Sequence, residues 1–304
     1  MLVTGIGQCC WDFLALVEAY PSADSKQEVF QWEEQGGGPV ATALVALSRL
    51  GVACRFHGVI GDDGLGELVL GSLVNEGIDC QGVVLRSGSN SQRAFIVVEK
   101  ENANRTIFWQ RPTGEPLSPE ELPEDYLNDC RLLLLDGLMV DVSLAAARDA
   151  SRHGVPVMLD AGRLRPGMAE LARLCSYVVA GEQFAFDLGW DGKDESFASV
   201  ASSLGAPVVT VTCGVRGSLT WRERGVIRQP AFPVPVIDTT GAGDVFHGGY
   251  VYGLLKGWEL PSVLTFAGAM AAIKCTRPGG RSGIPDLPQV LNFLRERGVP
   301  MPQI

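Results

Sequence analysis

The sequence predicts an α/β fold in which a mostly parallel sheet is covered by helices on both faces. Short apolar runs rich in β-branched residues alternate with segments whose apolar residues recur at helical spacing. Such alternation is typical of parallel strands joined by helical crossovers, and it places ligands at the carboxyl ends of the strands. The 304 residues contain no repeat and no linker rich in Gly, Ser or Pro, so we expect residues 1–304 to form a single domain.

The individual elements follow from these runs in chain order. Buried strands are predicted at Leu2–Ile6, Arg55–Ile60, Leu132–Asp136, Val155–Asp160, Tyr177–Ala180 and Val208–Thr212. Helices are predicted at Ala41–Leu50, Leu65–Glu76, Ser143–His153, Met168–Leu174, Phe197–Leu204, Val245–Leu255, Pro261–Lys274 and Leu287–Arg297. One more apolar strand is expected at Phe232–Ile237, and Pro233 and Pro235 should weaken its start.

Four shorter segments do not fit this rhythm and predict a second, small sheet. They are Leu14–Val17, Glu28–Trp32, Ser91–Val98 and Arg105–Gln110, and a hairpin turn at 102–104 joins the last two. A small sheet that stands off the main one would expose Trp32, Phe108 or Trp109, and an open apolar patch usually marks a partner. The alternative is that these strands only extend the edge of the main sheet.

Composition and charge disfavour several classes of function. The formal net charge of -10 disfavours nucleic acid or an anionic membrane as the main partner, although an acidic protein can hold a local basic pocket. Eight cysteines without paired CxxC spacing, and three histidines that lie beside no cysteine pair, indicate reduced thiols and no zinc site. The chain shows no secretory signal and no apolar run of membrane-spanning length, so we expect a cytoplasmic protein.

Residues 237–251 carry the strongest chemical signal. The small residues Gly241-Ala242-Gly243 form a turn, and a helix begins near Asp244. Unobstructed N–H groups at a helix start attract anions, but a carboxylate inside such a site would repel a phosphate that is merely held. The arrangement is reasonable if Asp244 accepts a proton from a hydroxyl that attacks the phosphate. The alternative is an ordinary turn in which Asp244 stabilises the first helical turn.

Other nucleotide and hydrolase motifs are incomplete. Gly5-Ile6-Gly7 lacks the third glycine of a dinucleotide fingerprint, Gly192-Lys193 is followed by Asp and so forms no P-loop, and no GxSxG elbow occurs. Two features suggest a sugar instead. Asp12 stands near the end of the first strand, where a carboxylate can accept hydrogen bonds from two vicinal hydroxyls. Gly36-Gly37-Gly38 would let a ligand approach the backbone ahead of an Ala-rich helix.

The segment DTTGAGDVFHGGY, residues 238–250, resembles the C-terminal signature of the ribokinase (PfkB) family of ATP-dependent sugar and nucleoside kinases. The resemblance implies a ribokinase-like fold in which the small sheet is a lid, inserted at about residues 13–35 and 90–112. Many members dimerise through this lid. It also implies that Asp244 is the catalytic base and that the amides of Gly241, Ala242 and Gly243 form the anion hole. ATP and Mg²⁺ are the implied cofactors.

Further matches extend the resemblance over about residues 2–286. Gly37 and Gly38 match the glycine pair that contacts the sugar, and Thr42 stands where many members have Asn. The positions that match the nucleotide side are Thr212, Gly214, Gly217, Gly243 and Cys275. The carbonyl groups that match a potassium site found in several relatives belong to Asp238, Thr240 and Gly280. The family's frequent Asn-x-x-Glu pattern is replaced by Gly181-Glu182-Gln183-Phe184.

The acceptor is expected to be a ketose, because parts of the chain resemble sulfofructose kinases and others resemble fructokinases of the ketohexokinase type. Of the residues that bind a sulfonate in the first subgroup only Lys26 remains, while Trp109 and Leu138 occupy the other positions. That pattern argues against a sulfonated sugar unless a basic residue compensates, and the candidates are Arg105, Arg111 and Arg163. The alternatives to a fructose-like sugar kinase are a ribokinase or nucleoside kinase and a non-catalytic sugar or nucleotide sensor on the same fold.

Overall fold

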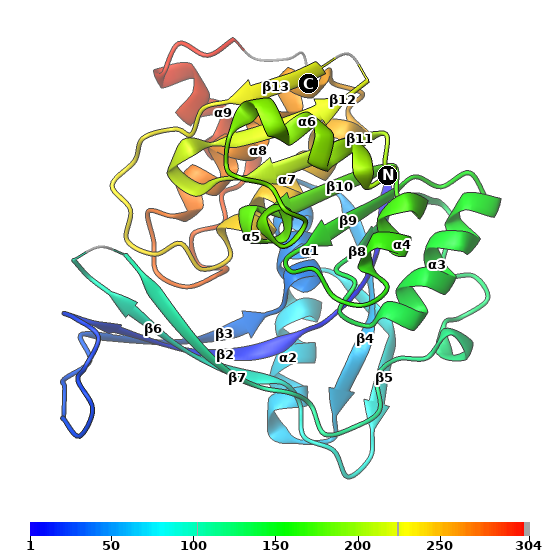
Figure 1. Cartoon of the computed structure of the whole chain (residues 1–304). Helices are drawn as coiled ribbons and strands as arrows, with labels where there is room; N and C mark the ends of the chain where they lie inside the picture. Colours follow the sequence, from blue (N-terminus) through cyan, green and yellow to red (C-terminus); the bar gives the residue numbers. More distant parts are fainter. Residues whose placement is uncertain (102, 224, 301–304) are drawn as a thin grey trace.

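The computed structural model describes residues 1–101, 103–223 and 225–300, and within them the strands form two sheets. The larger sheet has the strand order β13-β12-β11-β10-β9-β8-β1-β4-β5 (Figure 1). Its strands are β1 (Leu2–Ile6), β4 (Ala53–Gly61), β5 (Asp79–Arg86), β8 (Cys130–Leu135), β9 (Val157–Ala161), β10 (Tyr177–Gly181), β11 (Val208–Thr212), β12 (Ser218–Arg222) and β13 (Gly225–Gln229). All neighbouring pairs are parallel except β11–β12 and β12–β13. The predicted fold class is confirmed.

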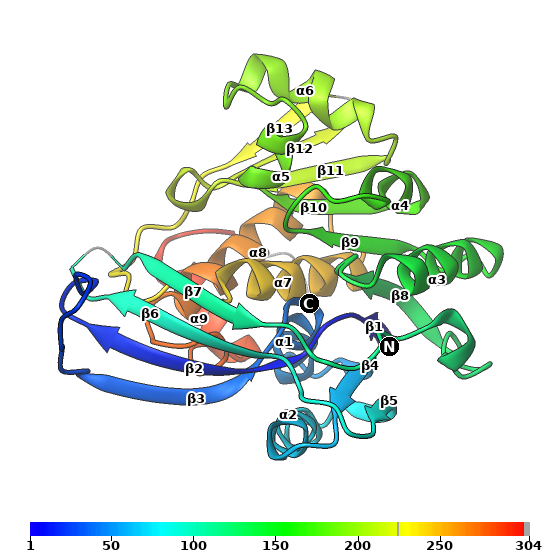
Figure 2. The same ribbon diagram turned by 60° about the horizontal axis from the view of Figure 1, so that its bottom comes forward.

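Helices cover both faces of the larger sheet (Figure 2). One face packs against α1 (Pro39–Arg49), α2 (Gly64–Asn75), α7 (Ala242–Leu255), α8 (Leu260–Lys274) and α9 (Leu287–Glu296). The other packs against α3 (Val140–Arg152), α4 (Met168–Leu174), α5 (Glu182–Asp187) and α6 (Asp194–Ser203). Met158 of β9 and Val179 of β10 share a core cluster with α7, so this helix lies against those two strands. None of the described helices is long and apolar enough to cross a membrane.

The smaller sheet, called the lid sheet below, extends away from the larger one (Figure 1). Its order is β3-β2-β6-β7, formed by β2 (Cys10–Val17), β3 (Gln31–Gly37), β6 (Arg93–Glu99) and β7 (Arg105–Gln110). Its inner face buries Leu14, Ala94, Ile96 and Val98, while Phe95 and Phe108 are exposed on the other face. The predicted second sheet is confirmed. Residue 102 of the predicted turn lies outside the described residues.

Several local predictions differ from the structure. The strand predicted at Phe232–Ile237 does not form, because Pro233 and Pro235 have no N–H to donate to a sheet partner. Strand β3 begins later than predicted and continues through Gly36 and Gly37, which pair with Trp11 and Cys10. Strands β5, β12 and β13 and helix α5 were not predicted.

Candidate active site

The turn at the start of α7, Gly241 to Asp244, has a geometry that suits an anion and is called the anion-binding turn below. Its N-cap, Gly241, has a φ of 73°, a left-handed conformation that favours glycine. Among the described residues, the N–H groups of Gly241, Gly243 and Asp244 have no hydrogen-bond partner, and they lie at the positive end of the helix. The N–H of Ala242 instead donates to the carbonyl of Thr239 at 3.1 Å and closes the turn. Of the three amides predicted to form the anion hole, those of Gly241 and Gly243 are free and that of Ala242 is not, while the N–H of Asp244 is free as well.

Asp238 ties this turn to the loop after α8. Its carboxylate is fully buried and accepts hydrogen bonds from the N–H of Thr240 at 2.8 Å and the N–H of Gly279 at 2.7 Å. Its carbonyl oxygen accepts a third hydrogen bond, from Nζ of Lys274 at 2.8 Å. The turn is therefore held in shape by the chain itself.

The carboxylate of Asp244 lies half-buried beside two other titratable groups. An oxygen of Asp244, an oxygen of Asp160 and a ring nitrogen of His247 all lie within 4.8 Å of one another. Asp160 pairs with Val179 on the neighbouring strand, and the carbonyl of Val179 contacts Nε2 of His247 at 3.1 Å. Burial, and then the negative charge of Asp160, raises the pKa of Asp244 to about 7. A carboxyl group with this pKa suits general-base chemistry near neutral pH.

A cavity of 1040 Å³ includes Asp160 in its lining. Other lining residues are Arg105 of β7, Asp136 after β8, Arg163 and Arg165 after β9, and Thr239. Nη1 of Arg105 donates to Oγ1 of Thr239 at 2.5 Å, so the lid sheet reaches the anion-binding turn. Burial raises the pKa of Asp136 to about 7, although this carboxylate accepts N–H groups from Gln8 and Leu138. Arginines and carboxylates therefore share one cavity beside the free carboxylate of Asp244.

Four residues predicted to bind the sugar come together where β2, β3 and α1 meet. Asp12 is buried and accepts a hydrogen bond from Sγ of Cys10 at 3.1 Å. A Cβ on Gly37 would lie 2.2 Å from Oδ2 of Asp12, so only glycine leaves room for this carboxylate. Gly38 is the N-cap of α1 with a φ of 100°, and Thr42 is buried in the first turns of that helix.

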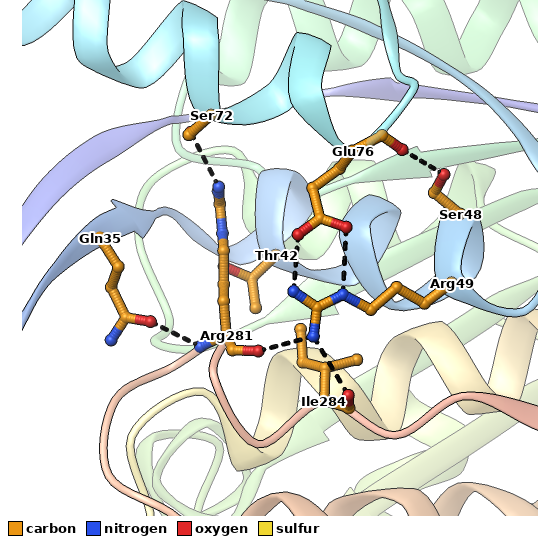
Figure 3. Close-up of polar contacts among 8 residues, drawn as sticks. All are labelled: Gln35, Thr42, Ser48, Arg49, Ser72, Glu76, Arg281 and Ile284. Carbon is orange, nitrogen blue, oxygen red and sulfur yellow. Dashed lines mark hydrogen bonds and ion pairs between the residues drawn. The ribbon is translucent and has the colours of Figure 1, made fainter. Parts of the chain in front are cut away.

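Arg281, from the loop after α8, joins the meeting point of β3 and α1 to α2 (Figure 3). Its buried guanidinium donates to Oγ1 of Thr42 at 3.3 Å, Oγ of Ser72 at 3.1 Å and the carbonyl of Gly37 at 3.1 Å. Its backbone N–H donates to Oε1 of Gln35 at 2.9 Å. Because the Thr42 oxygen already accepts from Arg281, its O–H remains to donate to a ligand.

Of the residues predicted for the nucleotide, Gly243 lies at the start of α7 and the other four lie near the ends of β11 and α8. Oγ1 of Thr212 donates to the carbonyl of Ala180 at 3.3 Å, and Gly214 and Gly217 flank a short 3₁₀ turn with φ values of 55° and 88°. Cys275 is buried at the end of α8, where its carbonyl accepts the N–H of Ile237 at 2.8 Å. Glu182, from the segment that replaces Asn-x-x-Glu, pairs with Arg216 at 2.5 Å.

The three basic residues predicted to contact the acceptor are not brought together. Lys26 is exposed on the segment between β2 and β3, and Arg111 lies 4.9 Å from the centre of the Trp109 ring. Neither is part of the cavity lining, whereas Arg163 is, with Asp187 as its ion-pair partner at 3.6 Å.

Sequence reasoning missed Asp136, Asp160, Arg165, His247, Lys274 and Arg281 as site residues. A usable signal existed for the first two, because each ends a predicted strand, and ligands gather at the carboxyl ends of parallel strands. His247 lies three residues after Asp244 on the same helix, so helical spacing was a usable signal for it as well. Arg165, Lys274 and Arg281 are brought to the site by contacts between segments distant in sequence, such as the 239 positions that separate Thr42 from Arg281.

Comparisons with known proteins cover almost the whole chain. Residues 2–287 match the pfkB family carbohydrate kinase. The ATP-dependent ribose-1-phosphate kinase of Halopiger xanaduensis is 28% identical over 296 residues, which cover 97% of this chain and 98% of the relative. The ribokinase of Haemophilus influenzae is 32% identical over 266 residues, which cover 85% of this chain and 87% of the relative. These two relatives are not named as sulfofructose kinases or ketohexokinases.

Solved structures show the same architecture. The crystal structure of ribokinase from Thermotoga maritima is similar with a TM-score of 0.81 and 26% identity, and covers 97% of this chain and 99% of that chain. The expected ribokinase-like fold, with a small second sheet as a lid, is confirmed.

Proposed function

The chain belongs to the pfkB family of carbohydrate kinases, and from this premise we propose that it transfers the γ-phosphoryl group of ATP to a primary hydroxyl of a small, ketose-like sugar. One observation carries the proposal. The carboxylate of Asp244 stands among free N–H groups at the start of α7, with a pKa raised toward neutrality. Such a group is suited to accept a hydroxyl proton next to a phosphoryl group that the amides stabilise.

In this mechanism the sugar wall of Asp12, Gly37, Gly38 and Thr42 orients the acceptor. Asp244 takes the hydroxyl proton as the hydroxyl oxygen attacks the γ-phosphorus of ATP and ADP leaves. The free N–H groups of the anion-binding turn donate to the phosphoryl oxygens, on which negative charge develops. A general base of this kind raises the rate of the chemical step on the order of 10²–10⁴-fold. Removal of one preorganised N–H donor raises the activation free energy by about 3 kcal/mol. Arg105, on the lid sheet, adds a positive charge and helps to exclude water.

The nucleotide would bind at Thr212, Gly214, Gly217 and Cys275. The residues at the cavity also fit magnesium, which prefers oxygen ligands and keeps several waters. Asp136 and Asp160 line the cavity, and Oδ2 of Asp160 is buried without a hydrogen-bond donor among the described residues. These carboxylates would hold the waters of the ion, whose chemistry, when it is bound with ATP, is to neutralise phosphate charge.

The cavity also bears on the identity of the sugar. Arg165 has no ion-pair partner among the described residues, and it shares the cavity with Arg105 and Arg163. These cations favour an acidic group, either on ATP or on the acceptor. The relative named ribose-1-phosphate kinase acts, by its name, on a phosphorylated sugar. A ketose remains our proposal, and acceptors with and without an acidic group belong in its test.

The test is ADP release in the presence of fructose, fructose 6-phosphate, sulfofructose, ribose, ribose 1-phosphate and nucleosides. We expect turnover that depends on the sugar and is fastest with a ketose. Fastest turnover with ribose, its phosphate or a nucleoside would contradict the ketose and leave the kinase in place. Saturable binding without turnover would support the alternative, a sensor on the same fold.

Assembly and location are further proposals. Phe13 stacks on Phe95 with ring centres 5.0 Å apart, and Phe95, Trp32 and Phe108 are each about half exposed on the lid sheet. We propose that a second copy of the chain covers this aromatic face.

We also propose that the protein works in the cytoplasm. The eight cysteines are free, as expected for a protein in a reducing compartment.

A further inference from the structure

The potassium site implied by the family resemblance does not fit this chain. Its expected ligands are the carbonyl oxygens of Asp238, Thr240 and Gly280. In the structure, Nζ of Lys274 donates to the carbonyl oxygen of Asp238 at 2.8 Å, and the Lys274 side chain is completely buried. One of the expected ligands is thus already bound to a positive charge. We propose that the Lys274 ammonium takes the place of the monovalent cation and that the enzyme works without potassium.

The surrounding backbone holds the ammonium next to the anion-binding turn. Lys274 is the last residue of α8, and the carbonyl of the following residue, Cys275, accepts the N–H groups of Ile237 and Asp238. On the other side, a Cβ on Gly241 would lie 2.8 Å from the carbonyl oxygen of Gly280, so the loop after α8 packs directly on the turn. The positive charge of the covalently attached cation therefore adds to the positive potential at the N-terminus of α7.

The charges around Lys274 suit one cation better than two. Burial lowers the pKa of Lys274, while the negative charges of Asp238 and Asp244 oppose that shift. Arg105 adds a further positive charge nearby. A potassium ion placed beside the buried ammonium would be repelled in a region of low dielectric.

The Lys274 ammonium can replace a potassium ion because the two are chemically similar. An ammonium group and a potassium ion carry the same charge and both bind carbonyl oxygens, but the ammonium needs no uptake from solution. The competing explanation is that Lys274 only fills space and satisfies the carbonyl of Asp238.

This inference rests on the proposed kinase activity, and its first test uses the wild-type enzyme. Turnover is measured in potassium and in choline salts at constant ionic strength, with magnesium held fixed. We expect the same kcat and the same KM for sugar in both. Clear activation by potassium would overturn the proposal.

Two variants separate a charged role from a space-filling one. Lys274→Ala opens room at the carbonyl oxygens, so we expect kcat in choline to fall on the order of 10²-fold and to be restored in large part by potassium or ammonium ions. Lys274→Met keeps the volume but not the charge, so it should be equally impaired and not rescued. Lys256→Met, at the C-cap of α7 and outside the site, is the matched control and should behave as wild type. Wild-type kcat for Lys274→Met in choline would show that the charge is dispensable and overturn the proposal.

Thermal unfolding supplies a readout that needs no turnover. We expect potassium, relative to choline, to raise the melting temperature of Lys274→Ala but not of the wild type. If no sugar is phosphorylated, this difference still tests the cation replacement, and that failure counts against the kinase proposal alone. If neither variant folds, the potassium response of the wild-type protein decides the question.

Discussion

His247 and Asp160 form a buried pair beside the carboxylate of Asp244. The carbonyl of Val179 can only accept a hydrogen bond, so Nε2 of His247 carries its hydrogen. Nδ1 then faces Oδ2 of Asp160 at 3.4 Å, and neither atom has another hydrogen-bond partner among the described residues. Burial lowers the pKa of His247, which favours its neutral imidazole, and burial raises the pKa of Asp160. The negative charge of Asp160 therefore acts on Asp244 without a charged histidine to offset it.

The first prediction concerns the pH dependence of turnover. Asp244 must be ionised to accept a proton, and its pKa is raised to about 7, so kcat should fall as the pH drops through about 7. An unperturbed aspartate would cause this loss only near pH 4. Asp160→Asn removes the neighbouring negative charge while its amide can still donate to His247. The acidic limb should therefore move to lower pH.

The measurement is the pH profile of kcat for both proteins, with folding checked at each pH. Arg105 and Asp12, which also influence Asp244, are unchanged in the variant. A uniform loss of activity with an unmoved acidic limb would show that Asp160 has only a structural role.

At the scale of elements, the side chains packed against the end of β3 explain why this strand contains two glycines. Gly36 and Gly37 pair with β2, and a Cβ at either position would meet Arg281 or Asp12. Gly37, which the sequence suggested for contact with a ligand, must thus also be a glycine to leave room for the carboxylate of Asp12. The loop after α8, strand β3 and α1 form one wall because Arg281, which belongs to this loop, donates hydrogen bonds to both β3 and α1.

The second prediction is that Gly37→Ala weakens acceptor binding. The new methyl group would stand 2.2 Å from Oδ2 of Asp12, so the carboxylate must move or the strand must shift. We expect a higher KM for the sugar and a loss of about 1–3 kcal/mol in the free energy of unfolding. Steady-state kinetics and urea unfolding measure the two effects.

Gly71→Ala is the control for this substitution. No atom lies within 4 Å of a Cβ at Gly71, which is in the middle of α2. There the change should leave KM unaffected and stabilise the helix by about 0.5–1 kcal/mol. An unchanged KM in Gly37→Ala would contradict the place given to Asp12 in the sugar wall.

Local patterns were sufficient for the regular elements and for the centre of the site. Periodicity predicted most strands and helices, and the turn before Asp244 was visible because its residues are adjacent in sequence. Prediction failed where distant contacts decide the structure. The run Phe232–Ile237 is apolar enough for a strand, but its prolines keep it out of the sheet and the N–H of Ile237 bonds instead to the carbonyl of Cys275. The role proposed for Lys274 depends on its contact with Asp238. A lysine at the end of a helix would otherwise be expected at the surface.

At the scale of the whole molecule, the residues of the candidate site come from both sheets. The larger sheet brings Asp136 and Asp160 to the cavity, where Asp160 lies beside Asp244 of α7. The lid sheet contributes Arg105 to the lining of this cavity, and it also carries Asp12. The lid sheet buries Leu14, Ala94, Ile96 and Val98 on its inner face, whereas Phe95 and Phe108 on its outer face are in contact with solvent. That asymmetry is the basis for the proposed dimer.

The third prediction is that Phe95→Asp converts a dimer into a monomer. Phe95 is 47% exposed at the centre of the aromatic face, so a carboxylate there would be buried without a partner in the interface. Light scattering after size-exclusion chromatography measures the mass. Leu85→Asp, at a residue that is 61% exposed on β5, is the control and should remain dimeric. A wild-type monomer at every concentration would refute the proposed assembly.

The central claim is that Asp244 removes the proton from the acceptor hydroxyl, and the direct test is single-turnover phosphoryl transfer by Asp244→Asn. We predict a variant that folds and binds ATP as the wild type does, with a rate lower on the order of 10²–10⁴-fold. Asp141→Asn, which also removes a carboxylate from the first turn of a helix, should keep the full rate. Phosphoryl transfer by Asp244→Asn at the wild-type rate would contradict the account.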